Sequence, residues 1–203
     1  FDDPQRPLAY RYGEGYREAT EWRETVRLKR GRNVEPREYT FRKTHHGPVI
    51  AKRGENQAIS VQVAKLYEAV LMRQLSRLLR AQNFTEFRAG MAMQNFPFMN
   101  TVYADADGNI FYLYNGTVPR RDPQFDWRSL QDGADPRTEW DGYLTIDELP
   151  QVLNPPSGYV QSCNSSPYTT TDDGNPSIGD FPKYLAEDAH DDKRRAVRSR
   201  QFL

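Results

Sequence analysis

The sequence predicts an α+β fold, and three patterns in its first 118 residues carry that prediction. Apolar and polar residues alternate with a period of two along several stretches before residue 63, which is typical of β-strands. The period then changes to that of an amphipathic helix within residues 67–82. An Asp-Gly pair separates two apolar runs at 99–114 and predicts a hairpin. We therefore expect a mixed or antiparallel sheet, one or two helices and a long loop-rich region.

The N-terminal strands are expected at 8–13, 19–30 and 37–43. Within the second of these, Trp22, Val26 and Leu28 share one strand face. The opposite face carries cations, namely Arg23, Arg27 and Lys29. The segment THHGPVIAKR then predicts a turn followed by a short apolar strand, and QAISVQV alternates again.

Two helices follow these strands. Apolar side chains recur at i, i+4, i+7 and i+8, which predicts one buried face made of Leu71, Leu75, Leu78 and Leu79. Arginines occupy the opposite face, at Arg73, Arg77 and Arg80. Thr85 is placed to cap a second helix over the segment EFRAGMAM.

Composition divides the chain into three regions. Residues 1–118 contain the strands and helices and end with the 99–114 hairpin, where Asp107-Gly108 suits a type I′ turn. Residues 119–182 hold most of the chain's 14 prolines and predict long loops, which usually line a site or wrap a partner. Residues 183–203 form a basic tail that is expected to be helical.

Charge and composition exclude several classes of protein. Lys plus Arg and Asp plus Glu both total 28, and this zero net charge argues against a nucleic-acid binder. The charge is segregated, with net +7 over residues 1–95 and net −8 over 96–185. We expect no membrane span, because no apolar run approaches the roughly 18 residues that a span requires. The single cysteine, Cys163, excludes an internal disulfide.

No metal site is predicted, and no motif for a catalytic cofactor is found. The three histidines lack an HExxH arrangement, so His45-His46 is expected to shape the turn before a strand. The segment DADGN fails the EF-hand pattern, because Gly108 falls at its fourth position rather than its sixth. The acidic pair Asp147-Glu148 is expected to cap a short helical turn.

Three segments together resemble the penicillin acylase family of N-terminal-nucleophile (Ntn) hydrolases, in order and in spacing. They are THHGPVI at 44–50, MNTVYADADGNIFYLYNGTVPRR at 99–121 and LPQVLNPPSGYVQSCNSSP at 149–167. The resemblance is to the broad group of penicillin, cephalosporin and acyl-homoserine-lactone acylases. It implies that the chain supplies part of the αββα sandwich of an Ntn hydrolase, as an interior fragment of the large (β) chain.

The resemblance also implies a reaction and two site residues. The family's enzymes are precursors that cut themselves, and the serine exposed at the new N-terminus attacks a linear amide with its own amine as base. The position that matches the family's oxyanion-hole asparagine is Asn100. The position that matches its supporting arginine is Arg121, with Arg120 as second choice.

The residues around Asn100 agree with this assignment without requiring it. Asparagine is disfavoured inside strands, yet Asn100 lies between Met99 and Thr101 in an apolar run. It shares a strand face with Val102 and Ala104, which are small enough to leave room beside it. From the residues alone, an asparagine satisfied by neighbouring backbone explains the pattern; the resemblance favours the oxyanion role.

The chain begins with Phe1, so we expect the nucleophile to lie outside it and this chain alone to be inactive. Its expected partners are the remainder of the precursor and a small amide substrate. The resemblance further implies a periplasmic or secreted protein, and a structural calcium in the full-length protein is an option.

A non-catalytic binding or assembly module on the same scaffold is the alternative function, and a calcium- or zinc-dependent hydrolase is disfavoured. The loop aromatics Phe125, Trp127, Trp140 and Tyr143 are expected to form a peripheral cluster, with an acyl-contact role as the alternative.

Overall fold

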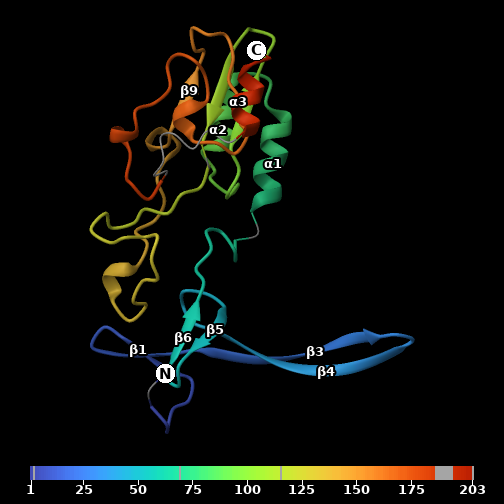
Figure 1. The fold of residues 1–203 in the computed structure, drawn as a ribbon, viewed down its shortest axis with the longest axis vertical. Coiled ribbons are helices and arrows are strands. Elements are labelled where there is room, and N and C mark those ends of the chain that lie inside the picture. Colours follow the sequence, from blue (N-terminus) through green and yellow to red (C-terminus); the bar gives the residue numbers. More distant parts are fainter. Residues whose placement is uncertain (2, 69, 115, 186–193, 203) are drawn as a thin grey trace. The chain divides into compact units, whose positions relative to one another are not determined.

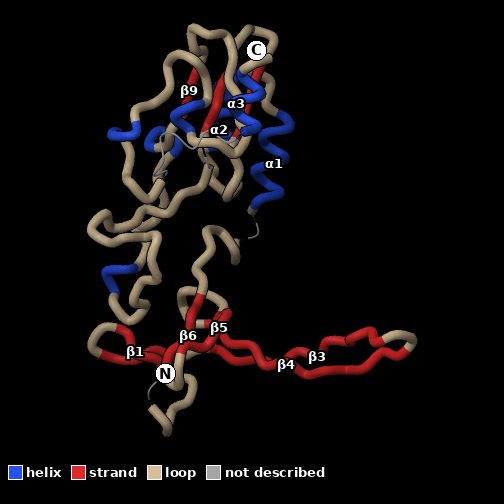
Figure 2. The backbone as a smooth tube through the Cα atoms, viewed as in Figure 1, coloured by secondary structure: helices blue, strands red, loops and turns tan. Residues whose placement is uncertain are grey.

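The computed structural model describes residues 1, 3–68, 70–114, 116–185 and 194–202. It combines antiparallel strands with α-helices, which confirms the α+β prediction (Figures 1 and 2). The chain folds as two compact units. Unit 1 contains Phe1–Val63 and Gln131–Glu139, and unit 2 contains Ala64–Leu130 and Trp140–Leu203. These units cut across the three regions distinguished by composition, because the loop 131–139 folds onto the N-terminal strands.

Unit 1 is built from three antiparallel hairpins. Their strands are β1 (Ala9–Tyr12) with β2 (Gly15–Glu18), β3 (Thr20–Arg30) with β4 (Asn33–Lys43), and β5 (Val49–Arg53) with β6 (Gln57–Ser60). All the strands expected in this part of the chain are present, and β2 is an additional one.

The β3–β4 hairpin is a long two-stranded ribbon (Figure 1), and one of its faces carries apolar side chains among charged ones. Its register pairs Trp22 with Phe41, and their rings stack at 5.6 Å between centroids. Val26 lies on the same face, as the alternation predicted. These three side chains remain 38%, 40% and 41% exposed for Trp22, Phe41 and Val26 respectively, so unit 1 does not cover this face.

Unit 2 packs helices against a three-stranded sheet. The helices are α1 (Leu71–Arg80), α2 (Phe84–Met91) and α3 (Arg194–Arg200), and the strands are β7 (Thr101–Ala104), β8 (Ile110–Leu113) and β9 (Gln151–Leu153). Strand β8 is central and pairs antiparallel with both β7 and β9. The sequence did not predict β9, because this strand has only three residues, between Pro150 and Asn154, and an apolar–polar alternation cannot be recognised over so short a stretch.

The core of unit 2 forms where these elements meet. Its buried side chains come from α2, β8 and the loops that follow, and they are Met91, Phe111, Leu113, Val118, Leu144, Ile146, Leu149 and Leu185. Aromatic rings from α2 and β7 pack against one side of this core. The ring centroids are 5.1 Å apart for Phe84 and Phe111 and 4.3 Å apart for Phe87 and Tyr103. The short apolar strand β8 therefore anchors both the sheet and the core.

Three local predictions are wrong. The leucine face predicted for α1 is not its buried face, because Leu71 and Leu79 are 40% and 86% exposed whereas Gln74 is fully buried. Asn83 rather than Thr85 caps α2, because its side chain accepts a hydrogen bond from the Glu86 N–H at 2.9 Å and Thr85 lies inside the helix. The β7–β8 connection is not a type I′ turn, because Gly108 alone of the Asp107-Gly108 pair has a positive φ. A five-residue loop from Asp105 to Asn109 makes the connection instead, stabilised by the Asp105 carboxylate.

Four short 3₁₀ turns and the tail complete the described structure. The turns span Pro136–Thr138 (in unit 1), Ile146–Glu148, Pro167–Thr169 and Ile178–Asp180. The basic tail is helical over α3, as predicted, and Arg195 in α3 donates to the Cys163 carbonyl and to Asn164. His190 and the rest of 186–193 lie outside the described residues. No helix in the described part of the chain is long and apolar enough to cross a membrane.

Replacing Leu113 with alanine tests the role of β8. Leu113 is fully buried on the central strand, so Leu113→Ala should lower the free energy of unfolding by about 2–5 kcal/mol. The matched control is Leu130→Ala in a loop, where Leu130 is 66% exposed and the expected change is within about 0.5 kcal/mol. Chemical denaturation of the full-length protein measures both; equal effects would contradict the packing described for β8.

Candidate functional site

Asn100 lies immediately before β7 and is half-buried. Its side-chain Nδ2 donates a hydrogen bond to the Ser162 hydroxyl at 3.1 Å. Ser162 belongs to the segment 149–167, whereas Asn100 belongs to 99–121. Two of the three motif segments therefore meet at this hydrogen bond, although 62 positions separate its partners. The contact orients the carboxamide of Asn100 at the edge of the sheet.

Arg121 lies among three aromatic rings. Its guanidinium carbon is 5.5 Å from the ring centroids of Trp127 and of Trp140, and 5.6 Å from that of Tyr184. The Arg121 backbone N–H also donates to the Tyr184 hydroxyl at 3.3 Å. In the described part of the chain, the buried Nε of Arg121 has no hydrogen-bond partner.

The charge of Arg121 is therefore balanced mainly by π-systems. Burial lowers the pKa of Arg121, and Tyr184 opposes this shift. Arginine stays protonated in proteins, so the group remains a partly desolvated cation. Cation–π contacts contribute up to about 2 kcal/mol when they are desolvated, which offsets part of the cost of burying the charge. Such a group is suited to interact with an anion that approaches it.

Arg120 has a different environment. Its guanidinium donates to both carboxylate oxygens of Glu148, at 3.0 and 2.8 Å. Glu148 also accepts from the N–H and the hydroxyl of Thr145, which forms a capping box on the 3₁₀ turn Ile146–Glu148. The capping role expected for the Asp147-Glu148 pair is thus confirmed for Glu148. Arg120 therefore links the segment that follows β8 to this turn, and its charge is paired with that of Glu148.

The Glu148 carboxylate should make stability depend on pH. Hydrogen bonds from Arg120, and then from Thr145, lower the pKa of Glu148 from 4.5 to about 2. Its stabilising effect is therefore complete above about pH 4.5 and is lost as the pH falls towards 2. The Tm difference between the wild-type protein and Glu148→Gln should shrink between about pH 6 and about pH 3.

Thermal unfolding followed by circular dichroism measures this difference. The control is Glu55→Gln, which changes an exposed glutamate in the turn between β5 and β6 and should alter Tm little at any pH. A Tm difference for Glu148→Gln that stays constant over this range would contradict the role given to Glu148.

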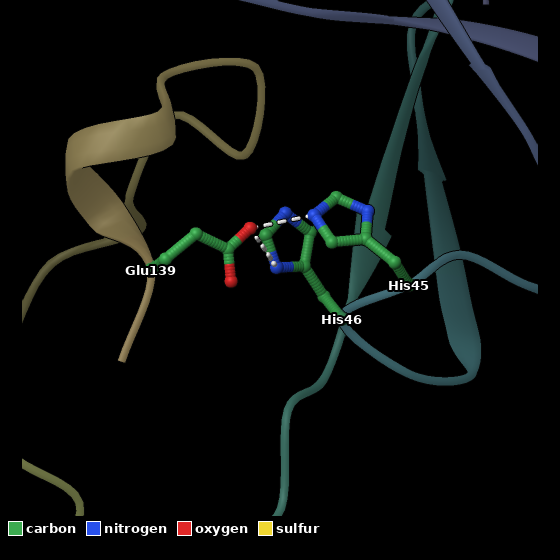
Figure 3. A group of neighbouring side chains, drawn as sticks. All are labelled: His45, His46 and Glu139. Carbon is green, nitrogen blue, oxygen red and sulfur yellow. Dashed lines mark hydrogen bonds and ion pairs between the residues drawn. The ribbon is translucent and has the colours of Figure 1, made fainter. Parts of the chain in front are cut away.

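A second cluster of polar side chains lies within unit 1. His45 and His46 occupy the turn between β4 and β5, and both rings point towards the carboxylate of Glu139 (Figure 3). The Oε1 atom of Glu139 is 2.6 Å from His45 Nε2 and 3.8 Å from His46 Nδ1. Burial lowers the pKa of His45, and the hydrogen bond to Glu139 partly opposes this shift. The histidines do shape the turn, as predicted, but Glu139 was not foreseen.

Contacts within unit 2 show where the predicted loop aromatics lie and which partners the sequence did not reveal. Phe125 packs edge-on against Trp127, so two of the four loop aromatics expected to cluster contact each other. Trp127 and Trp140 in addition face Arg121, while Tyr143 lies under the Lys65 ammonium at 4.2 Å. Ser162 and Tyr184 were missed as partners, because a lone hydroxyl in a loop gives no periodic or motif signal.

Comparison with known proteins identifies the family. The family model described as penicillin amidase matches residues 2–203. Penicillin G acylase of Escherichia coli is 30% identical over 149 residues, which cover 71% of this chain and 17% of that protein. Penicillin acylase 2 proenzyme of Pseudomonas sp. (strain SE83) is 25% identical over 182 residues, which cover 89% of this chain and 22% of that protein.

A solved structure agrees with these sequence relatives. The thermostable penicillin G acylase from Alcaligenes faecalis, in orthorhombic form, superposes with a TM-score of 0.68 at 27% identity. The match covers 87% of this chain and 31% of that chain. The fold and the family model together place the chain among Ntn hydrolases. It belongs to the penicillin amidase family, as the three motif segments predicted. The chain spans about a fifth of the length of these curated relatives.

Proposed function

We propose that this chain forms part of an amidohydrolase that cleaves a linear amide into a carboxylic acid and an amine. The observation that carries the proposal is the family match over residues 2–203, which includes Asn100, the residue immediately before β7. The substrate class is an acyl amide, such as the acyl side chain of a β-lactam or an N-acyl-homoserine lactone. An exported protein made as a self-processing precursor, with a structural calcium as an option, belongs to the same proposal.

The proposed mechanism gives Asn100 the task of stabilising negative charge. A serine at the N-terminus of a processed chain, outside these 203 residues, attacks the amide carbonyl, and its α-amine takes the hydroxyl proton. The carbonyl oxygen becomes an oxyanion that requires N–H donors oriented before the reaction. A carboxamide nitrogen carries two hydrogens. We assign one to Ser162, which fixes the orientation of the amide, and the other to the oxyanion.

Arg121 supports this site in the proposal, and Arg120 does not. Arg120 is paired with Glu148, whereas no described carboxylate pairs with Arg121. We assign this half-buried cation of unit 2 the task of stabilising the amide orientation of Asn100 or of binding the acid end of the substrate. The aromatic rings of Trp127 and Trp140 hold the guanidinium in place.

Replacing Asn100 with alanine in the full-length protein tests the proposal. Loss of one oxyanion donor should lower kcat by about 10²–10³-fold, and it should also slow self-processing. Tm should change little, because Asn100 is only half-buried. Steady-state hydrolysis of an acyl amide measures kcat, and a near-wild-type value would refute the assignment.

Two controls isolate the effect. Asn56→Ala removes an exposed carboxamide from a turn in unit 1 and should leave kcat unchanged. Ser162→Ala leaves Asn100 in place but removes its hydroxyl partner, so it should lower kcat by less than Asn100→Ala. If Ser162→Ala were neutral, orientation by Ser162 would be excluded while the donor role of Asn100 would stand.

Arginine-to-lysine substitutions distinguish the two arginines. Arg121→Lys keeps the charge but loses the planar group that stacks on Trp127 and Trp140, so kcat/KM should fall by at least about 10-fold. Arg120→Lys weakens only a half-exposed ion pair, and kcat/KM should stay within about 2-fold of wild type. Equal effects on kcat/KM would contradict the role given to Arg121.

A further inference from the structure

We propose that His45, His46 and Glu139 form a binding site for a divalent transition metal ion, with Zn²⁺ as the natural occupant. Each side chain offers one ligand atom, and the three atoms lie within 4.8 Å of one another. Two imidazole nitrogens and one carboxylate oxygen are a common ligand set for zinc, with a water molecule at the fourth position. All three residues belong to unit 1, whereas Asn100 and Arg121 belong to unit 2.

The distances between the ligand atoms suit zinc. A tetrahedral ion with bonds of 2.0–2.2 Å places its ligand atoms about 3.3 Å apart. The Glu139 Oε1 atom is 2.6 Å from His45 Nε2 and 3.8 Å from His46 Nδ1, so one separation is shorter and the other longer than this value. The three ligand atoms lie within 4.8 Å of one another, so side-chain rotations must bring them to about 3.3 Å, and both rings already face the carboxylate (Figure 3).

In each histidine, the ring nitrogen that does not face Glu139 is hydrogen-bonded elsewhere in unit 1, which leaves the other nitrogen to bind the metal. His46 Nε2 lies 3.0 Å from the Gly133 carbonyl oxygen, which only accepts, so Nε2 carries the proton and Nδ1 keeps its lone pair for the metal. His45 Nδ1 lies 2.7 Å from the Tyr10 hydroxyl. Such partners behind ligating histidines fix the tautomer and the orientation of the ring.

Metal binding requires one proton to move on His45. Without metal, His45 Nε2–H donates to the Glu139 carboxylate. When zinc takes the Nε2 lone pair, the proton resides on Nδ1 and donates to the Tyr10 oxygen. That oxygen can accept it, because a hydroxyl has two acceptor sites and only one is used by the His45 backbone N–H at 3.1 Å. Neutral His45 therefore binds zinc without net proton release.

The backbone holds the site in place before any metal binds. Gly47 closes the turn at φ 140°, and a Cβ there would collide with the Val61 carbonyl, so the turn accepts glycine alone. The loop that carries Glu139 is anchored by the Gly13 N–H, which donates to the Ala134 carbonyl at 2.7 Å. The imidazole rings are mostly buried, with side-chain exposures of 20% for His45 and 11% for His46. A carboxylate 31% exposed leaves a route for the ion to enter.

The environment favours a neutral pair of imidazoles over a charged one. The two rings lie 3.8 Å apart between centroids, so protonating both would place like charges in contact. Tyr12 packs edge-on against His45, with 4.8 Å between ring centroids, and the Arg17 guanidinium lies over Tyr12.

Zinc titration of the full-length protein tests the proposal. The protein is first treated with a zinc-selective chelator, and Ca²⁺ is kept in excess so that oxygen-ligand sites stay filled. We expect one Zn²⁺ to bind by calorimetry, and His46→Ala and Glu139→Gln to weaken it by at least about 100-fold. Tyr10→Phe should weaken it by about 10-fold, because it removes only the partner behind His45.

The matched control is Glu55→Gln, which removes an exposed carboxylate from unit 1 and should leave zinc affinity unchanged. Circular dichroism and Tm in the presence of chelator establish that each variant is folded. X-ray absorption of the wild-type zinc complex needs no variant and should show imidazole nitrogen and oxygen ligands. Zinc binding that His46→Ala and Glu139→Gln leave unchanged, or the absence of specific binding, would overturn the proposal. The readout is zinc affinity, so neither result bears on amide hydrolysis.

Discussion

The antiparallel pairing of β8 with strands on both of its edges is the constraint on which unit 2 depends. Strand β8 contributes Phe111 and Leu113 to the core, and it pairs with β7 and β9 through four and three residue pairs respectively. The pairing with β7 fixes where Asn100 lies, and the pairing with β9 fixes the start of the segment that carries Ser162. The position of a polar side chain at the sheet edge therefore follows from apolar packing in its centre.

The two neighbouring arginines show how packing separates roles that the sequence leaves open. Arg120 reaches a carboxylate at the surface and closes a capped turn. Arg121 points instead among aromatic rings, where its charge stays partly desolvated. A cation in such a place is costly to the fold, and sites of this kind are more frequent where charge is needed for binding or chemistry.

Periodicity and turn chemistry predicted most of the regular structure. Alternation located β3 and β4, and the leucine spacing located α1, because both signals extend over ten or more residues. The same reasoning missed β9, which has three residues. It also misplaced the cap of α2, since two polar residues that flank Phe84 both suit that position. The motif segments identified Asn100 and Arg121, whose assigned roles stay predictions. Glu139 could not be foreseen, since it meets His45 across 94 positions of sequence and only the fold joins them.

The β3–β4 ribbon has a consequence for the behaviour of the chain in concentrated solution. In the described part of the chain, β3 and β4 pair only with each other, so the ribbon offers unpaired backbone groups along its outer edges, and Trp22, Val26 and Phe41 are exposed on one face. Ribbons of this kind can add strands from other molecules and grow into aggregates. The cations Arg23, Arg27 and Lys29 on the opposite face put like charges close together in any such stack. Arg23 is paired with Glu38 on this face, so the cations that oppose stacking there are chiefly Arg27 and Lys29.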